Sequence, residues 1–525
     1  MPPVSLPNGF PIETWQVAKP SIRGTKGVVA AQNVEAATVG AAVLSAGGNA
    51  VDAAVATALA LTVVEPWMSG LGGGGYGLVY DGGSTRTHAV DFGMIAPNGL
   101  DPAAYPIVAG RDAPPDLFGW PAVVEDRNLQ GYHSIAVPGS CAGYATLLER
   151  FGTWSWADAL GPAIALAERG HRVTWWTTLQ VAAEAAWLRR YPESARIWLP
   201  DALVPVATDA APAHNSLGAL VATLIRLRDA GWRDFYDGEI AAALVADLNA
   251  GGSTVSMADL AAYAPRITKP ITCRRGDHDL HLPPGYTAGP TFAGALGRLP
   301  DGFGHAGADA AAYRAMAEAM IESYKVRLAT MGHAGDVGDR SCTTHISAVD
   351  ADGGMVAITT TLLSRFGSRV VLPGTGVLMN NGINWFDPRP GHANSIAPSQ
   401  RPLSNMSPVL ATRDGKAWFG LGASGGRKIM PAIFQLASFL GVMGMDLDDA
   451  FQQPRIDISL VDRIVAEQRL DPAIMTALAD VAPVETAPAL AYPSQWAIPN
   501  AVMLDENGPS GAAHVFGPLN AAVGA

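Results

Sequence analysis

Two adjacent threonines, Thr343 and Thr344, open a β-branched stretch directly after residues 331–340, a polar segment that contains three glycines. A threonine hydroxyl in the middle of a chain has no base of its own and is a weak nucleophile. Cleavage between Cys342 and Thr343 frees an α-amino group that can serve as that base. A mobile loop followed by a threonine-led strand is the layout expected of a self-cleaving precursor, but a Thr-Thr pair that opens a strand is ordinary strand composition, so the spacing alone does not distinguish the two.

Residues 422–426 have the glycine-rich sequence Gly-Ala-Ser-Gly-Gly, which two kinds of chemistry could use. Backbone N–H groups of a glycine turn ahead of a helix can stabilise the oxyanion of acyl transfer. The same letters fit the G-x-S-x-G elbow of α/β-hydrolases, with Ser424 as the nucleophile. Asp457 or Asp462 and then His514 follow in the chain order that this fold requires. Hairpins rather than parallel strands precede the loop, which disfavours the α/β-hydrolase interpretation.

Three further patterns carry little chemical signal. The glycines at 72–75 are followed by no Gly-Lys-Ser/Thr sequence, so nucleotide binding is not indicated. His278 and His281 are three residues apart in a strand-like run and point to opposite faces, which disfavours a zinc site. No base is placed near Cys342, which we expect to pack as a small residue. We therefore predict no cofactor and no metal.

The elements that position the threonines form the clearest hairpin in the sequence. Residues 343–349 and 355–362 flank the turn Asp352-Gly353. If these two residues form the whole turn, the pairing places the two leading threonines beside Thr361 and Leu362. The far end of this hairpin is then rich in hydroxyl groups.

A second predicted hairpin, 409–412 with 417–421, leads into the glycine sequence and then into an apolar helix from residue 429. Alanine-rich segments at 34–44 and 51–64 predict two mostly buried helices. The strand, glycine turn and helix follow in the order that an oxyanion site needs.

Composition excludes several classes of protein. Hydrophobic residues make up 49% and charged residues 16%, which indicates a compact globular protein. The net charge of −12 has the wrong sign for nucleic acid or anionic lipid. The run 429–445 is too short and too interrupted for a membrane span. Three scattered cysteines favour a reducing compartment. Because the first residues show no secretory pattern, we expect a cytoplasmic location.

The order of several short sequences resembles the γ-glutamyltransferase family of N-terminal nucleophile hydrolases, over roughly residues 27–460. Each sequence is common alone, but their order is specific. The stretches that carry the resemblance are residues 27–31, 46–56, 64–66, 69–75, 137–139, 235–239, 259–263, 343–347, 373–376, 380–381, 401–404, 406–408 and 425–426.

The resemblance implies an α+β fold, a four-layer αββα sandwich made as one precursor. The nucleophile of the family corresponds to Thr343, so the cleavage site is Cys342–Thr343. The products are then a large subunit, 1–342, and a small subunit, 343–525, which stay together in one core. A dimer of these processed pairs is a family expectation.

The remaining site roles also follow from the resemblance, residue by residue. Thr361 is expected to hydrogen-bond the nucleophile and assist self-cleavage. Gly425 and Gly426 are expected to supply the oxyanion N–H groups, and Ser404 is expected to lie in the substrate pocket.

Several positions depart from the family pattern. The arginine that follows Asp-Phe and binds the substrate α-carboxylate is Gly93 here. An asparagine near the paired threonine is Leu363, the expected glutamine and aspartate align with Gly382 and Trp385, and the second serine of a pair is Asn405. Without both charged partners of an amino-acid head group, γ-glutamyl recognition is lost.

We therefore expect a different amide substrate. The sequence Glu-Pro-Trp-Met-Ser at 65–69 is similar to that of the oxamate amidohydrolase branch. Members of this branch hydrolyse oxamate to oxalate and ammonia in purine catabolism. Trp385 would make the pocket small and apolar, and Asn405 would hydrogen-bond the substrate. Arg365 and Arg427 are candidate partners for an oxamate carboxylate.

Three alternatives stay open at this point. One is a cephalosporin-type or other acyl-amide acylase, which needs a roomy apolar pocket. Another is a γ-glutamyltransferase or γ-glutamyl hydrolase with unfamiliar binding residues. The third is an unprocessed, non-enzymatic homologue.

Overall fold

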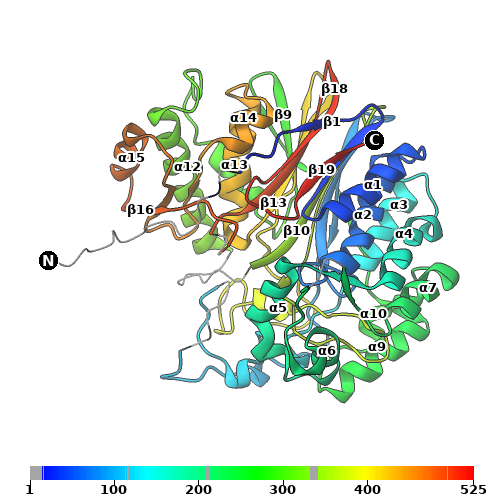
Figure 1. The fold of residues 1–525 in the computed structure, drawn as a ribbon. Helices are drawn as coiled ribbons and strands as arrows, with labels where there is room; N and C mark the ends of the chain where they lie inside the picture. Colours follow the sequence, from blue (N-terminus) through cyan, green and yellow to red (C-terminus); the bar gives the residue numbers. More distant parts are fainter. Residues whose placement is uncertain are drawn as a thin grey trace, which may run out of the picture.

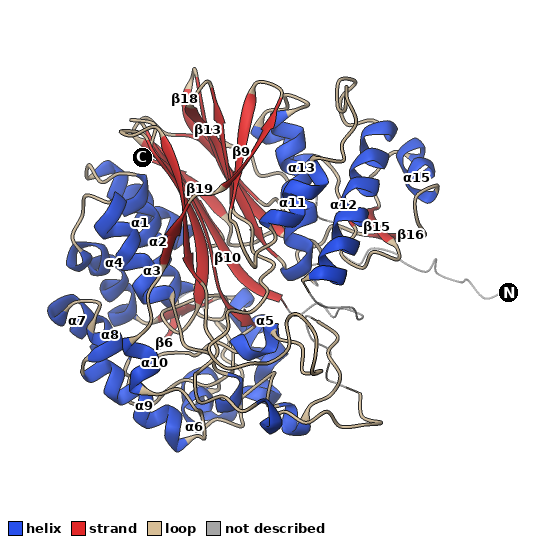
Figure 2. Ribbon diagram, turned by 180° about the vertical axis from the view of Figure 1, so that it is seen from behind, coloured by secondary structure: helices blue, strands red, loops and turns tan. Residues whose placement is uncertain are grey.

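A computed structural model describes residues 15, 17–112, 114, 118–208, 212–331, 341–492 and 495–525. Two seven-stranded sheets lie face to face, and helices cover the outer face of each sheet (Figure 1, Figure 2). The layers are thus helix, sheet, sheet and helix, which confirms the predicted αββα sandwich. Residues 332–340, part of the predicted mobile loop, lie outside the described residues.

Seven strands make up the first sheet: β2 (Gly27–Ala31), β3 (Gly74–Asp81), β4 (Arg86–Phe92), β7 (Arg266–Thr268), β10 (Ser341–Asp350), β11 (Met355–Ser364) and β19 (Ala521–Gly524). Their order is β19-β2-β10-β11-β3-β4-β7, and every pair is antiparallel. The two halves of the first predicted hairpin, β10 and β11, are therefore inner strands. Both faces of β11 are buried, which suits its β-branched composition.

Four helices pack outside this sheet: α1 (Val34–Ser45), α2 (Ala50–Val64), α3 (Ser140–Phe151) and α4 (Trp156–Arg169). Every residue of α2 is buried, because α2 lies between the sheet and α4. The predicted alanine-rich helices are thus confirmed. Six more helices continue this layer: α5 (Trp175–Leu188), α6 (Pro192–Trp198), α7 (Leu220–Ala230), α8 (Asp234–Asp237), α9 (Glu239–Ala250) and α10 (Met257–Ala261).

The second sheet contains β1 (Ile22–Arg23), β8 (Ile271–Arg275), β9 (His278–Leu282), β12 (Val409–Arg413), β13 (Lys416–Ser424), β17 (Ile498–Asp505) and β18 (Gly508–Ala513). Its order is β1-β18-β17-β13-β12-β9-β8, again antiparallel. The second predicted hairpin is β12–β13. The outer face of the second sheet is covered by the layer of α11 (Gly289–Leu296), α12 (Ala310–Thr330) and α13 (Ile429–Gly441). Smaller elements include β5 (His171–Val173), β6 (Ala213–Asn215), β14 (Ile456–Asp457), β15 (Ile464–Glu467), β16 (Val484–Ala487), α14 (Leu447–Gln452) and α15 (Pro472–Ala479).

The helix that begins at residue 429 is α13, and it is buried along nearly its whole length. Among the described residues, no helix combines the length and the apolar character that crossing a membrane requires.

The register of the first hairpin differs from the prediction. Asp350 pairs across a wider turn with Gly354, and its carboxylate accepts bonds from the backbone N–H groups of Asp352 and Gly354. Thr344 consequently faces Thr360 rather than Thr361. A bulge at Thr343 then restores the predicted alignment, because Cys342 faces Leu363.

Candidate active site

Thr343 lies at the bulge, with only 5% of its surface exposed. Its Oγ1 donates to the carbonyl oxygen of Cys342 at 2.7 Å and lies 3.3 Å from Oγ1 of Thr361. The Thr361 hydroxyl also donates to the Cys342 carbonyl oxygen. The Thr343 hydroxyl thus lies against the Cys342 carbonyl group, and the Thr361 hydroxyl is a donor that stabilises negative charge on this oxygen.

The neighbouring loop fixes Thr361 in this position. The backbone N–H of Leu363 donates to Thr361 Oγ1 at 2.8 Å. On the other side, Gly73 packs so closely that a Cβ atom there would lie 2.4 Å from the Thr361 carbonyl oxygen. The glycine loop at 69–75 therefore has a packing role, because only glycine lets it approach β11.

The predicted oxyanion glycines form a tight turn between β13 and α13. Gly425 has a φ of 134° and Gly426 a φ of 55°, conformations that favour glycine. The backbone N–H of Lys428 donates to the Gly425 carbonyl at 3.0 Å and closes the turn. The short 3₁₀ turn Gly426–Lys428 contacts β10, the strand that carries Thr343.

A cavity of about 260 Å³ opens beside this turn. The cavity wall includes Glu65, Met68, Arg365, Ser424 and Gly425. Met68 also contacts the residue that precedes Thr343, because its Sδ lies 2.9 Å from Cys342 Sγ. Aromatic side chains form much of the remaining wall: Trp67, Trp176, Tyr492, Trp496 and Phe516.

Arg365 makes no hydrogen bond or ion pair with any described residue, and its Nε is buried without a partner. The structure thus brings Arg365 and Gly425 to one cavity. Arg427 lies elsewhere, because its guanidinium is buried and donates to the Ser459 carbonyl. Burial raises the pKa of the Cys342 thiol to about 12, so this cysteine is a neutral packing residue, as predicted.

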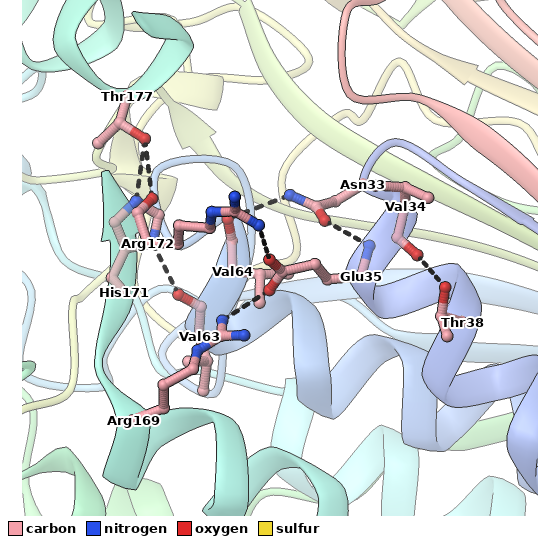
Figure 3. Close-up of polar contacts among 10 residues, drawn as sticks. All are labelled: Asn33, Val34, Glu35, Thr38, Val63, Val64, Arg169, His171, Arg172 and Thr177. Atoms are coloured by element: carbon pink, nitrogen blue, oxygen red, sulfur yellow. Dashed lines mark hydrogen bonds and ion pairs between the residues drawn. The ribbon is translucent and has the colours of Figure 1, made fainter. Parts of the chain in front are cut away.

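Glu65 was not assigned a role from the sequence. It follows α2, whose last carbonyls are capped by side chains (Figure 3): Asn33 Nδ2 donates to the Val64 carbonyl at 3.3 Å, and His171 Nδ1 donates to the Val63 carbonyl at 3.0 Å. Glu65 itself is fully buried, and the Thr344 hydroxyl donates to its Oε2 at 3.3 Å. Burial raises the pKa of Glu65 to about 8, so this carboxyl is mainly protonated at neutral pH.

Ser404 and Asn405 lie together in a buried segment that Arg327 holds. Arg327 donates through Nη2 to the Ser404 carbonyl at 2.7 Å and to Asn405 Oδ1 at 3.1 Å. The Ser404 hydroxyl accepts from the backbone N–H of Met406 at 3.1 Å. Arg327 was missed by the sequence analysis, and the only available signal was its place in the last turn of a helix.

The positions that depart from the family pattern are filled by other side chains. A Cβ atom at Gly93 would lie 2.9 Å from the Tyr76 hydroxyl, and one at Gly382 would lie 2.8 Å from Met94 Sδ. Trp385 is buried in the same apolar cluster as Tyr76 and Met94. A side chain at either glycine would therefore collide with these neighbours.

The α/β-hydrolase interpretation is wrong. The two seven-stranded sheets are antiparallel, and the three side chains of the expected triad are bonded to other residues. Ser424 Oγ accepts from Gln32 Nε2 at 2.5 Å, Asp457 bonds Ser459 at 2.9 Å, and His514 Nδ1 lies 3.4 Å from Arg455. The other candidate acid, Asp462, lies 3.6 Å from Arg463.

Within the described ranges, no group of three or more His, Cys, Asp or Glu side chains is arranged to hold a metal ion. His278 and His281 have partners on or beside the second sheet. The Nδ1 of His278 bonds Asp277, and His281 bonds Thr272 and Thr412.

Comparison with known proteins agrees with this geometry. A family profile described as Gamma-glutamyltranspeptidase matches residues 36–337 and 328–515. The chain is 32% identical to the Acylase ACY 1 proenzyme of Pseudomonas sp. (strain SE83) over 497 residues, 86% of each chain. It is 29% identical to the Glutathione hydrolase proenzyme of Bacillus subtilis (strain 168) over 490 residues, 82% of this chain and 81% of that protein. The crystal structure of cephalosporin acylase from Bacillus halodurans superposes with a TM-score of 0.82 at 22% identity, covering 99% of both chains, a likeness that establishes the fold.

Fold and relatives together define a hydrolase of the N-terminal nucleophile type that acts on amide bonds. The chain belongs to the γ-glutamyltranspeptidase family.

Proposed function

We propose that this chain cuts itself between Cys342 and Thr343 and that Thr343 then serves as the nucleophile of an amidohydrolase. The observation that carries the proposal is the pair of threonine hydroxyls on the Cys342 carbonyl oxygen. The Thr343 hydroxyl oxygen attacks that carbonyl carbon, the C–N bond breaks, and the hydroxyl proton ends on the released nitrogen. Water hydrolyses the resulting ester, which leaves a carboxylic acid on Cys342 and a free amine on Thr343.

The mature reaction repeats this chemistry on a substrate amide. The free α-amino group of Thr343 takes the hydroxyl proton as the oxygen attacks the substrate carbonyl. The N–H groups of Gly425 and Gly426 stabilise the oxyanion, and the position of Gly425 on the cavity wall supports this role. The proton passes to the leaving amine, and water releases the acid from Thr343. The processed subunits are then 1–342 and 343–525.

The substrate that we favour is a small amide that lacks the γ-glutamyl head group, such as oxamate, which would yield oxalate and ammonia. The loss of γ-glutamyl recognition is supported by glycine at positions 93 and 382, where neighbouring side chains leave no room for a longer residue. Among the described residues, Arg365 Nε and Asn405 Nδ2 have no hydrogen-bond partner, so both side chains can donate to a substrate carboxylate. A cytoplasmic location would suit such a catabolic role.

A larger acyl amide, as in an acylase, is the second candidate, and the cavity beside Gly425 has room for its acyl group. A single water needs roughly 10–15 Å³ by a comparable measure, whereas the cavity measures about 260 Å³. Its aromatic wall suits an apolar group better than a six-atom anion such as oxamate. A relative that is 32% identical is named an acylase.

A panel of three substrates separates these candidates: oxamate, adipyl-p-nitroanilide as a bulky acyl amide, and γ-glutamyl-p-nitroanilide. We expect hydrolysis of one of the first two by the wild-type protein and none by Thr343→Ala. Preference for the γ-glutamyl compound would contradict the proposed loss of γ-glutamyl recognition. An intact, inactive wild-type chain would instead indicate a non-enzymatic homologue.

A further inference from the structure

The cavity beside Gly425 is built from segments that are far apart in the chain. Helix α5, the loop after β11 and the stretches at 491–498 and 514–520 supply most of its wall. Ser404 and Asn405 do not belong to the described part of this wall. The cavity is therefore a different part of the site from the segment at 404–405.

Aromatic rings form one side of the cavity. Trp176 and Tyr492 pack edge to face with their ring centroids 6.2 Å apart, and the Trp496 indole N–H donates to the Pro488 carbonyl at 3.0 Å. An apolar protein cavity of about 150 Å³ holds a benzene ring. Because this cavity measures about 260 Å³, it has room for an aromatic ring with a short side arm.

Arg365 brings a positive charge to the same wall. Its guanidinium has no hydrogen-bond or ion-pair partner in the described part of the chain, and its Nε is buried. A carboxylate is the group that pairs most strongly with a guanidinium, because two parallel N–H···O bonds can form. Arg365 therefore favours an anionic ligand.

The other ionisable groups of the wall do not cancel this charge. Burial raises the pKa of Glu65 to about 8, so its carboxyl is mainly neutral at pH 7. Glu184 is buried and pairs with Arg369 at 3.1 Å, which offsets its charge. Burial lowers the pKa of His514 well below its ordinary value, so the imidazole is neutral. The ammonium group of Lys428, which donates to the Gln495 carbonyl at 2.7 Å, adds a second positive charge.

Gln180 supplies neutral hydrogen-bonding groups beside the aromatic rings. Only 2% of its surface is exposed, and its amide forms no hydrogen bond with any residue that the structure describes. Leaving a buried amide without a partner is costly, and a polar ligand in the cavity would offset that cost.

We infer that this cavity binds an aromatic carboxylate, with the ring against the aromatic wall, the carboxylate on Arg365 and a hydrogen bond from Gln180. The ligand is part of the amide substrate, because Gly425, assigned to the oxyanion, lies on the same wall. The inference rests on the proposed function and develops its second candidate, the larger amide. The carboxylate belongs either to the acyl group or to the leaving amine, and the test separates these two sources.

Binding of 3-phenylpropionate to the wild-type protein is the first measurement. Quenching of tryptophan fluorescence reports it, because Trp67, Trp176 and Trp496 line the cavity. We expect 3-phenylpropionate to bind about tenfold or more tightly than 3-phenylpropanol, which lacks the charge, and than propionate, which lacks the ring. Equal affinity for 3-phenylpropionate and either of the other two compounds would overturn the inference.

Variants of the wall test the assigned contacts. Arg365→Met should bring the affinities for 3-phenylpropionate and 3-phenylpropanol together, and Gln180→Glu should weaken only the binding of the carboxylate. The exposed Arg86→Met is the control and should keep the wild-type ratio. Because the alcohol reports the intact cavity, a misfolded variant is recognised by loss of both ligands. An unchanged ratio in Arg365→Met would contradict the pairing with the carboxylate.

Two pairs of amides assign the carboxylate to one side of the bond that is cut. 4-Carboxyphenylacetamide against phenylacetamide places it on the acyl group, and 4-acetamidobenzoate against acetanilide places it on the leaving amine. We expect a higher kcat/KM for the carboxylate form in one pair, and loss of that preference in Arg365→Met. No preference in either pair would contradict a role in substrate binding. Failure of the proposed function is seen separately, as a wild-type chain that neither cleaves itself nor hydrolyses any amide.

Discussion

Thr361 contacts the Cys342–Thr343 peptide bond through its hydroxyl group, which donates to the Cys342 carbonyl oxygen. Removing one such donor commonly slows acyl transfer by about 10²–10³-fold. We expect Thr361→Ala to slow self-cleavage by a similar factor and Thr361→Ser to retain most of the rate, because serine keeps the hydroxyl. Mass spectrometry of freshly translated protein over time measures this rate. Equal rates in Thr361→Ala and wild type would contradict the assigned role.

Glu65 makes stability depend on pH. Its pKa is raised from 4.5 to about 8 in the folded protein. Between these values the unfolded chain releases a proton that the folded protein keeps, so stability falls as pH rises through this window. At roughly 1.4 kcal/mol for each pKa unit, the loss is on the order of 5 kcal/mol by pH 8.

We therefore expect Glu65→Gln, which is neutral at every pH, to flatten the decline in unfolding free energy between about pH 5 and pH 8. Urea unfolding at several pH values checks this, with the exposed Glu506→Gln as the control. The same pH slope in Glu65→Gln and wild type would show that the buried carboxyl is ionised.

At the scale of elements, Asn33 joins two helices beside the site. Its Oδ1 accepts from the backbone N–H of Glu35 and caps the start of α1, while its Nδ2 donates to Val64 at the end of α2. We expect Asn33→Ala to lower the free energy of unfolding by about 1–2 kcal/mol, because both contacts are lost. Asn33→Ser keeps a capping acceptor and loses the contact with Val64 without adding a charge, so a smaller loss is expected in urea unfolding. A variant Asn33→Ala as stable as wild type would contradict this account.

The strands of the first hairpin could be predicted from the sequence, but their register could not. Composition and the Asp-Gly pair correctly predict two strands and a hydroxyl-rich end. The register was wrong by one residue near the turn, because Asp350 accepts backbone hydrogen bonds and widens it. The bulge at Thr343, which sets the contact with Thr361, depends on tertiary packing that no local pattern encodes.

Arg327 was missed for a related reason. In the sequence it resembles a solvent-facing arginine at the end of an amphipathic helix. Its burial requires the segment at 404–405, far along the chain, to pack against α12. The resemblance to a family assigns roles to Thr343, Gly425 and Asn405, but it gives no contacts for positions where this chain departs from the family pattern.

At the scale of the whole molecule, the two predicted subunits are interleaved. β10, the strand that carries Thr343, pairs with β2, and β11 pairs with β3, so strands from 1–342 and 343–525 are hydrogen-bonded to each other in one sheet. Strand β19, near the end of the chain, also pairs with β2. Separating the subunits would expose the core of this sheet to water.

We expect the cleaved protein to keep a native mass of 54.5 kDa, or a multiple of it, and to separate into two chains only in denaturant. Native mass spectrometry before and after addition of guanidinium checks this. Free subunits under native conditions would contradict the interleaved core.

The central claim is that Thr343 becomes the N-terminal nucleophile, and the intact mass of freshly purified protein beside its Thr343→Ala variant tests it most directly. The account predicts two wild-type chains, one ending at Cys342 and one beginning at Thr343, and a single uncut chain in the variant. A single uncut wild-type chain, or cleavage at the same bond in Thr343→Ala, would contradict it.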